Sequence, residues 1–236
     1  MQEIRARFVE RVKRSETIES FRFVPQKKID FIPGQFLQVI FDEAKRENKE
    51  LNKYLSFSSS PVKGYIEVTK RLSESVFSQK LKNLKIQDQV LLKLPLGGCV
   101  FKEDYKKIAF LIGGIGVTPV IYILEYIIDK KLGTDVLLFY SNRIEAEIAF
   151  KKELDAWQEA NRNIKVFYTI TDCQPKDQRY IFGRISKELL LEKIKDLNER
   201  VFFIFGPPKM VEAMNALCLE ARCQKENIRI ENFIGY

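Results

Sequence analysis

Apolar and polar residues alternate in short runs over the first hundred residues of the chain. These runs occupy residues 5–12, 19–24, 35–41, 65–70 and 89–94, with turn residues between them. Short alternating runs at close spacing are typical of antiparallel strands that are buried on one face. One stretch, 75–81, has helical spacing, with Ser73 or Ser75 as its N-cap. The pattern predicts a small antiparallel β-barrel or sandwich that includes one helix.

The rhythm changes near residue 105. Apolar strand-like runs at 107–112, 135–140, 164–170, 201–205 and 228–230 alternate with helical runs at 120–128, 147–160, 186–197 and 210–222. Strands that alternate with helices form βαβ units, whose parallel sheet is covered on both faces. We therefore expect two domains: an antiparallel β-barrel over 1–100 and a doubly wound α/β domain with a parallel sheet over 101–236.

Charge is distributed unevenly between these halves. The 236 residues carry a net charge of +8; residues 1–100 hold 19 basic and 12 acidic residues, and the remainder holds 21 and 20. The basic residues form no tandem aromatic repeat or helix-turn-helix, so a nucleic-acid partner is not expected. An acidic protein partner for the basic half fits better.

Several classes of protein are disfavoured by composition. The chain has no histidine, which removes the Ser-His-Asp hydrolases, and its four cysteines are scattered without a CxxC, so no metal site is expected. The charged, alternating start is unlike a secretory signal, and no apolar run reaches about 18 residues. The sequence predicts a cytoplasmic protein with no membrane insertion.

A glycine-rich turn joins the first parallel strand to its helix. Its candidate ligand-binding residues are Gly113, Gly114, Gly116, Thr118 and Pro119. Glycines at this point allow a tight turn and close approach of a pyrophosphate to the N–H groups at the helix start. The alternative is a close-packed turn that binds nothing.

Two further strand ends carry candidate nucleotide ligands. Ser141 and Arg143 follow the second parallel strand, where a donor and a cation suit the 2′-phosphate of NADP. Gly206, Pro207 and Met210 follow a later strand at the same edge of the sheet. The alternatives are that Arg143 pairs with a nearby glutamate and that the third turn is an ordinary helix start.

The basic half contains its own candidate anion site. A polar run holds Lys53, Tyr54, Leu55 and Ser56, followed by serines at 58–60, which suits a phosphate or a flavin ring edge or is simply a loop. Farther along stand Lys70 and a helix start with Ser75 and Ser78. One dinucleotide site in each half indicates electron transfer between two nucleotides.

Taken together, the segments resemble the ferredoxin–NADP⁺ reductase superfamily in its compact prokaryotic form, over essentially the whole chain. The matching pieces are residues 33–36, 53–56, 75–78, 94–97, 113–119, 140–143, 183–184, 206–210 and 231–236. The resemblance implies a flavin-binding barrel and an NADP(H)-binding domain. The implied cofactors are FAD, with FMN as the alternative, and NADPH, with NADH as the alternative.

The resemblance also implies roles for individual residues near the flavin. Lys53 stands where the family has the arginine that meets the flavin phosphate, and Leu55 stands where it has the stacking tyrosine. Ser56 is kept and lies near the reactive nitrogen in the family. Phe205 replaces a cysteine that lies close to the nicotinamide.

The C-terminal segment matches the part of the family that completes the flavin site. Glu231 matches the carboxylate that relays protons through Ser56, and Phe233 or Tyr236 matches the aromatic residue that covers the flavin. The alternative is a last strand with an apolar plug.

Three functions follow from these observations. The first is an enzyme that passes electrons between NADPH and an acidic carrier protein such as ferredoxin or flavodoxin. The second is a reductase or electron-transfer subunit of a larger oxygenase, hydrogenase or dehydrogenase complex. The third, a non-catalytic nucleotide-binding or nucleic-acid-binding domain, fits the charge pattern least.

Overall fold

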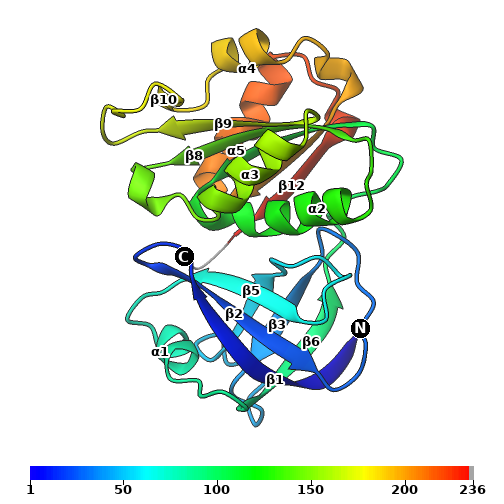
Figure 1. Ribbon diagram of the computed structural model, residues 1–236, viewed down its shortest axis with the longest axis vertical. Helices are drawn as coiled ribbons and strands as arrows, with labels where there is room; N and C mark the ends of the chain where they lie inside the picture. The colour runs from blue at the N-terminus through cyan, green and yellow to red at the C-terminus, as the bar shows by residue number, and fades with distance from the viewer. Residues whose placement is uncertain (234–236) are drawn as a thin grey trace. The chain divides into compact units, whose positions relative to one another are not determined.

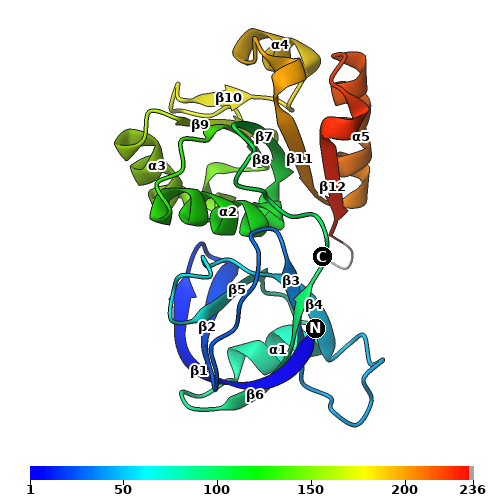
Figure 2. The same ribbon diagram turned by 90° about the vertical axis from the view of Figure 1, so that its right-hand side faces the viewer.

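The computed structural model describes residues 1–233. The chain divides into two compact units. The first contains Met1–Phe101 together with Thr118–Lys131, and the second contains Lys102–Val117 and the chain from Leu132 onward. Each unit is described by itself below, and the elements are labelled in Figures 1 and 2.

The first unit is built on a six-stranded antiparallel sheet. Its strands are β1 (Gln2–Lys13), β2 (Ile18–Pro25), β3 (Phe36–Ile40), β4 (Asn52–Ser56), β5 (Ile66–Arg71) and β6 (Gln89–Leu96), in the order β4-β3-β6-β1-β2-β5. An isolated antiparallel bridge between Phe57 and Val68 joins the chain after β4 to β5. The sheet thereby closes on itself, which confirms the predicted antiparallel barrel.

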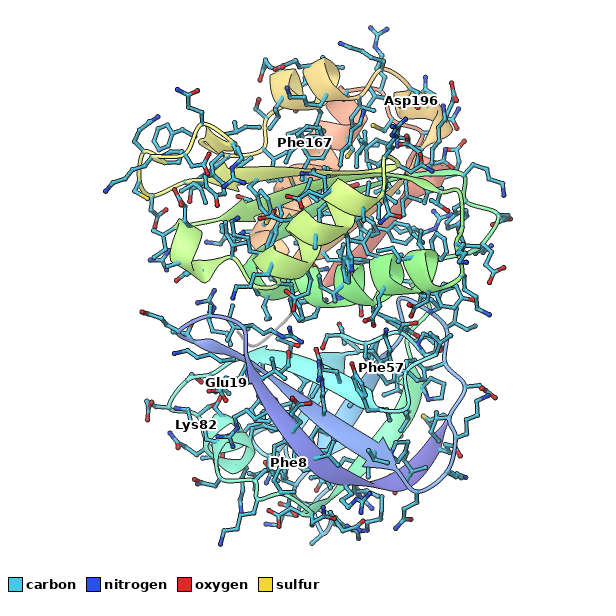
Figure 3. The ribbon with its side chains drawn as sticks, viewed as in Figure 1. Phe8, Glu19, Phe57, Lys82, Phe167 and Asp196 are labelled. Carbon is cyan, nitrogen blue, oxygen red and sulfur yellow. The ribbon has the colours of Figure 1, made fainter. Side chains whose placement is uncertain are left out.

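The barrel is filled by aromatic and branched side chains from the inward-facing strand positions. Phe8 and Phe57, labelled in Figure 3, are both fully buried members of this core. Phe8 packs against Phe21 and Phe23 with ring centroids 6.1 and 5.7 Å apart. Alternation along β1 and β2 therefore places one face of each strand in the core, as the sequence pattern predicts.

Two helices belong to the first unit. Helix α1 (Val76–Lys82) begins after Ser75, whose side chain accepts a hydrogen bond from the N–H of Ser78, so the predicted cap is confirmed. Helix α2 (Thr118–Asp129) follows the glycine turn in sequence. Tyr122 of α2 joins the barrel core, 5.4 Å from the ring of Phe31 and 5.8 Å from that of Phe57.

The second unit is built on a six-stranded parallel sheet. Its strands are β7 (Lys107–Gly113), β8 (Asp135–Asn142), β9 (Ile164–Ile170), β10 (Tyr180–Phe182), β11 (Val201–Gly206) and β12 (Ile228–Asn232), in the order β10-β9-β8-β7-β11-β12. Three α-helices accompany it: α3 (Lys151–Ala160), α4 (Lys187–Lys193) and α5 (Pro208–Glu220). Short 3-10 helices cover Gly114–Val117, Glu145–Glu147, Leu197–Glu199 and Lys225–Asn227.

These helices lie on both faces of the parallel sheet. Phe167 of β9 packs with the cluster that α4 and α5 form on one face, and Figure 3 shows it on that side. The next residue, Tyr168, points to the other face, where its hydroxyl donates to Asp155 of α3 over 2.8 Å. Figure 2 shows α3 and α5 on opposite sides of the sheet. The doubly wound prediction is confirmed.

Some element boundaries differ from the sequence prediction. Strand β4 was predicted only as a polar run, and the three-residue β10 was missed. The helix predicted to start at residue 147 starts at Lys151, because Phe150 has a left-handed backbone with φ of 58°. The helix predicted to end at residue 197 ends at Lys193, where Ile194 becomes extended. Among residues 1–233, the structure contains no helix with the length and hydropathy needed to span a bilayer.

Candidate functional site

The glycine turn lies at the ends of two neighbouring central strands of the second unit. Strand β7 pairs with β8 on one side and with β11 on the other. The strands β8 to β10 extend the sheet from β7 in one direction, and β11 and β12 extend it in the other. The turn after β7 therefore lies where the order of the strands changes direction. Ligands of open α/β sheets bind at the carboxyl ends of the strands at such a point. The predicted glycine turn therefore occupies the expected position for a dinucleotide.

Close packing explains two of the glycines in this turn. A Cβ added to Gly116 would lie 2.5 Å from the carbonyl oxygen of Phe205, and one added to Gly113 would collide with the sulfur of Met210. Gly206 lies beside Gly113 across the same edge. The structure thus brings together the turn after β7 and the turn after β11, as the sequence analysis predicts for Gly113, Gly116, Gly206 and Met210.

The remaining glycine of the turn leaves open space. Gly114 has φ of +52°, and no atom outside the turn lies within 4 Å of an added Cβ. Thr118 and Pro119 open α2, and Pro119 stands in its first turn as predicted. Pro207 is the N-cap of α5 and has an extended backbone. A partly exposed glycine beside a helix start fits the pyrophosphate of a dinucleotide.

Arg143 is held by a carboxylate that the sequence analysis did not single out. Its Nε donates to Asp172 Oδ2 over 3.0 Å, while the backbone N–H of Asp172 donates to the carbonyl of Arg143 over 2.9 Å. Thr171 donates its hydroxyl to the other oxygen of Asp172. The Arg143 guanidinium and this hydroxyl hold the pKa of Asp172 below its usual range. Neither of the glutamates at 145 and 147 is the hydrogen-bonding partner of the Arg143 Nε.

Asp172 was missed because it follows β9 rather than β8. A carboxylate directly after the next parallel strand lies at the same sheet edge as Arg143. Its position right after a predicted strand is the sequence feature from which Asp172 could have been predicted.

Polar groups without partners lie beside this pair. Ser141, the next-to-last residue of β8, pairs in register with Gly113 and Thr169. The side-chain amide of Asn142 and the hydroxyl of Thr169 are buried and have no hydrogen-bond partner within residues 1–233. Buried polar groups are normally satisfied by protein, water or ligand. These unpaired polar atoms are buried at the strand ends next to the Arg143–Asp172 pair.

Two lysines approach each other in the first unit. Lys70 is only 6% exposed, and its pKa is lowered by burial and by the positive charge of Lys53. Two nearby cations, one of them buried, favour an anion between or beside them. The two lysines predicted for the flavin site therefore influence each other electrostatically.

The hydroxyls near the start of α1 form a connected cluster. Ser75 Oγ donates to Ser78 Oγ over 3.0 Å, and Ser73 Oγ donates to Ser75 Oγ over 3.1 Å. These groups fix the first turn of α1, with Ser78 fully buried. The predicted pair Ser75 and Ser78 is therefore brought together, and its first role is to cap the helix.

Strand β4 separates its candidate residues by alternation. Leu55 points into the barrel core and is 3% exposed, whereas Tyr54 is 60% exposed and meets the ring of Phe36 edge-on at 5.8 Å. Ser56, at the end of the strand, is 8% exposed. The serines that follow are structural: Ser58 contacts Glu67 and Thr69, and the hydroxyl of Ser59 accepts from the N–H of Glu67.

The C-terminal strand brings a partly buried carboxyl to the edge of the parallel sheet. Glu231 pairs in register with Phe205, and burial raises its pKa to about 7. The N–H of Phe233 donates to the carbonyl of Gly206 over 2.9 Å, and its ring lies parallel to that of Phe205 at 6.4 Å. Tyr236, the other predicted aromatic cover, lies outside the described residues. No group of His, Cys, Asp or Glu side chains within residues 1–233 is arranged to hold a metal ion.

Two family models match the two halves of the chain. The "Oxidoreductase FAD-binding domain" matches residues 5–101, and the "Oxidoreductase NAD-binding domain" matches residues 110–216. The first match contains the Lys53 and Lys70 pair, and the second contains the glycine turn. FAD and NAD(P)H binding are thus supported by both the donor groups and the family.

Curated relatives and solved structures agree with these matches. "NADH-cytochrome b5 reductase 1" of Dictyostelium discoideum is 29% identical over 199 residues, which cover 82% of this chain and 69% of that protein. "Nitrate reductase [NADH] 1" of Nicotiana tabacum is 32% identical over 149 residues, 57% of this chain but 16% of that protein.

The structure of a ferredoxin NADP⁺ reductase from Neisseria gonorrhoeae "with bound FAD and NADP" is similar in fold. It superposes with a TM-score of 0.82 at 20% identity, covering 98% of this chain and 99% of that one. The chain therefore contains an oxidoreductase FAD-binding domain and an oxidoreductase NAD-binding domain, and its fold is that of ferredoxin reductases.

Proposed function

We propose that this protein is a flavin-dependent NAD(P)H oxidoreductase that passes electrons to a protein acceptor. The observation that carries the proposal is the presence of a separate phosphate-binding arrangement in each unit. One is the lysine pair of the barrel, and the other is the glycine turn at the switch point of the parallel sheet.

The residues of the first unit fit FAD by charge. Lys53 and Lys70 would neutralise the flavin pyrophosphate, and the N-terminal turn of α1 with Ser75 and Ser78 would direct N–H groups toward it. When bound, FAD supplies the redox chemistry by accepting a hydride from NAD(P)H and releasing its two electrons singly. Leu55 gives this site no stacking ring, so charge and backbone donors carry more of the binding.

The residues of the second unit fit a pyridine dinucleotide. Gly114 leaves space for the pyrophosphate, and the packed glycines Gly113 and Gly116 keep side chains out of its path. Glu231, whose pKa burial raises to about 7, holds a proton at its carboxyl oxygen near neutral pH. We propose that it takes part in proton relay with Ser56, as its match to the family suggests.

We propose that NADH is preferred over NADPH. The sequence argument for NADPH depends on a cation at residue 143, and in the structure that cation is paired with Asp172. A carboxylate at this sheet edge suits ribose hydroxyls as acceptor and repels a 2′-phosphate. The curated relatives named above are themselves called NADH-dependent.

The acceptor is proposed to be a protein with an acidic docking surface. The excess of basic residues in the first hundred residues would steer such a carrier, with rates that fall as salt rises. Ferredoxin and flavodoxin are candidates, and the relative named for cytochrome b5 adds a haem protein. Because the chain spans 16% of the tobacco nitrate reductase, a role as the reductase part of a larger complex is a second candidate.

The test is cofactor binding and dye reduction by the purified protein. We expect a bound or reconstitutable flavin and NADH-dependent reduction of ferricyanide. Lys70→Met is expected to weaken FAD binding by about tenfold or more, because it removes a buried cation from the phosphate site. Lys80→Met, at an exposed position in the last turn of α1, is the control. A colourless protein that FAD does not render active would refute the proposal.

A further inference from the structure

A cavity lies in the first unit, and none of the residues assigned to the flavin lines it. It has a volume of about 710 Å³ and is enclosed by three segments: the loop after β2, the loop before β5, and the C-terminal half of α2. Neither Lys53, Lys70 nor the start of α1 lines it. Its volume falls within the range of small-molecule sites, about 300–1,000 Å³.

The floor of this cavity is apolar. Ile29, Phe31 and Ile66 are each at least nine-tenths buried and line it from two different segments. Phe31 is fixed by stacking on Phe57 at 4.0 Å. Tyr65 forms part of the wall, and one face of its ring is covered by the Arg22 guanidinium at 4.7 Å. A planar or aliphatic ligand body could lie on this floor.

The rim is strongly basic. Lys27, Lys28, Lys63 and Lys130 line the cavity against a single acidic residue, Asp30. Lys63 is neutralised, because its Nζ lies 3.4 Å from Glu125 and 3.6 Å from Asp129 of α2.

The other three lysines remain available at the rim. All three are exposed, and within residues 1–233 none of them forms an ion pair. Lys130 lies 5.9 Å from the ring centroid of Tyr126, which also lines the cavity. The rim therefore carries more positive charge than its surroundings balance, and this excess is placed above an apolar floor.

We propose that this cavity binds a small organic anion with an apolar body, of the phosphate-ester class. An inorganic ion alone would use the rim and leave the floor unused, whereas a neutral apolar molecule would leave the positive excess of three lysines over Asp30 unbalanced. The proposal is independent of the flavin and dinucleotide sites, because it uses none of their residues.

The site is also held by contacts that do not depend on a ligand. The N–H of Ser60 donates to Glu125 over 2.6 Å, and together with the Lys63 contacts this ties α2 to the loop before β5. A ligand that touches Tyr126 and Gly64 would bridge the same two elements.

The test uses 1-naphthyl phosphate as the probe, with isothermal titration calorimetry on the flavin-loaded full chain. Saturating ADP-ribose is included so that the dinucleotide site is blocked. The cavity variant is Lys27→Gln/Lys28→Gln/Lys130→Gln. The control variant, which removes the same number of charges elsewhere, is Lys13→Gln/Lys85→Gln/Lys152→Gln. All six positions are exposed.

We expect binding of one equivalent, weakened about tenfold or more in the cavity variant and less than about twofold in the control. Inorganic phosphate, titrated separately, should bind at least about tenfold more weakly than the probe, because it does not use the floor. Absence of binding with ADP-ribose present, equal loss in both variants, or equal affinity for inorganic phosphate would each overturn the proposal.

Discussion

Replacing Glu231 by glutamine tests whether the last strand delivers a protonated carboxyl at neutral pH. The structure raises the pKa of Glu231 from its ordinary 4.5 to about 7, with burial as the cause. This change corresponds to about 3 kcal/mol, since each tenfold change in the acid equilibrium is worth about 1.4 kcal/mol. The variant removes the titration and keeps the shape of the side chain.

The sign of the effect follows from where the proton is bound. Below pH 4.5 the carboxyl is protonated in both the folded and the unfolded chain, so wild type and Glu231→Gln have the same pH dependence. Between pH 4.5 and about 7 only the folded chain keeps the proton, and the free energy of unfolding of wild type falls as pH rises. Above pH 7 the free energy of unfolding of wild type should have fallen by about 3 kcal/mol relative to that of the variant.

Two measurements check this prediction. The ¹³C resonance of the Glu231 carboxyl, identified by its absence from the variant, should titrate with a midpoint near 7. Denaturant unfolding at pH 4.5 and pH 8 should give the difference in stability, with the exposed Glu226→Gln as the matched control. A midpoint near 4.5, or an identical pH dependence in Glu231→Gln and wild type, would refute the reasoning.

Two other predictions concern the dinucleotide. Asp172→Asn should release Arg143 and raise kcat/KM for NADPH relative to NADH by about tenfold in steady-state kinetics, since one charge pair is converted to a free cation. Asp177→Asn disrupts a similar ion pair elsewhere on the surface and is the control. An equal shift of the NADPH to NADH ratio in the control would contradict the assignment. Gly116→Ala should weaken NADH binding and lower stability by about 1–3 kcal/mol, because its Cβ meets a carbonyl at 2.5 Å. Gly133→Ala, whose Cβ meets no atom, is the calorimetric control, and unchanged NADH affinity in Gly116→Ala would be the contrary result.

The fold could be predicted from the sequence because each half has a consistent periodicity. Phe8, Phe21 and Phe23 alternate with polar residues and face the barrel core, while the apolar run 107–112 is buried on both faces as in parallel sheets. Strand β4 could not be predicted in the same way. Its polar residues Asn52 and Ser56 are buried and mask the alternation, with the Asn52 side chain accepting from the N–H groups of Phe41 and Asp42.

The site was predictable where one local segment carries the chemistry. The glycine turn is contiguous, so its sequence and its place after a strand are visible together. The pairing of Arg143 with Asp172 depends on two strand ends 29 residues apart, and the sequence favoured nearer carboxylates equally. The sequence likewise left undecided whether Ser58 and Ser59 bind a ligand or are structural, because their partners Glu67 and Thr69 lie on another strand.

The order of glycines in the turn follows from three different requirements. A Cβ at Gly113 would require the flexible Met210 side chain to move, whereas a Cβ at Gly116 would meet a backbone carbonyl of β11 that cannot easily shift. Gly114 is needed for its positive φ alone, since its surroundings are open. Ile115, between them, is buried and anchors the turn. The turn has the pattern GGxGxxP, in which Gly113 and Gly116 pack against α5 and β11, and Gly114 is the position that we propose to face the dinucleotide.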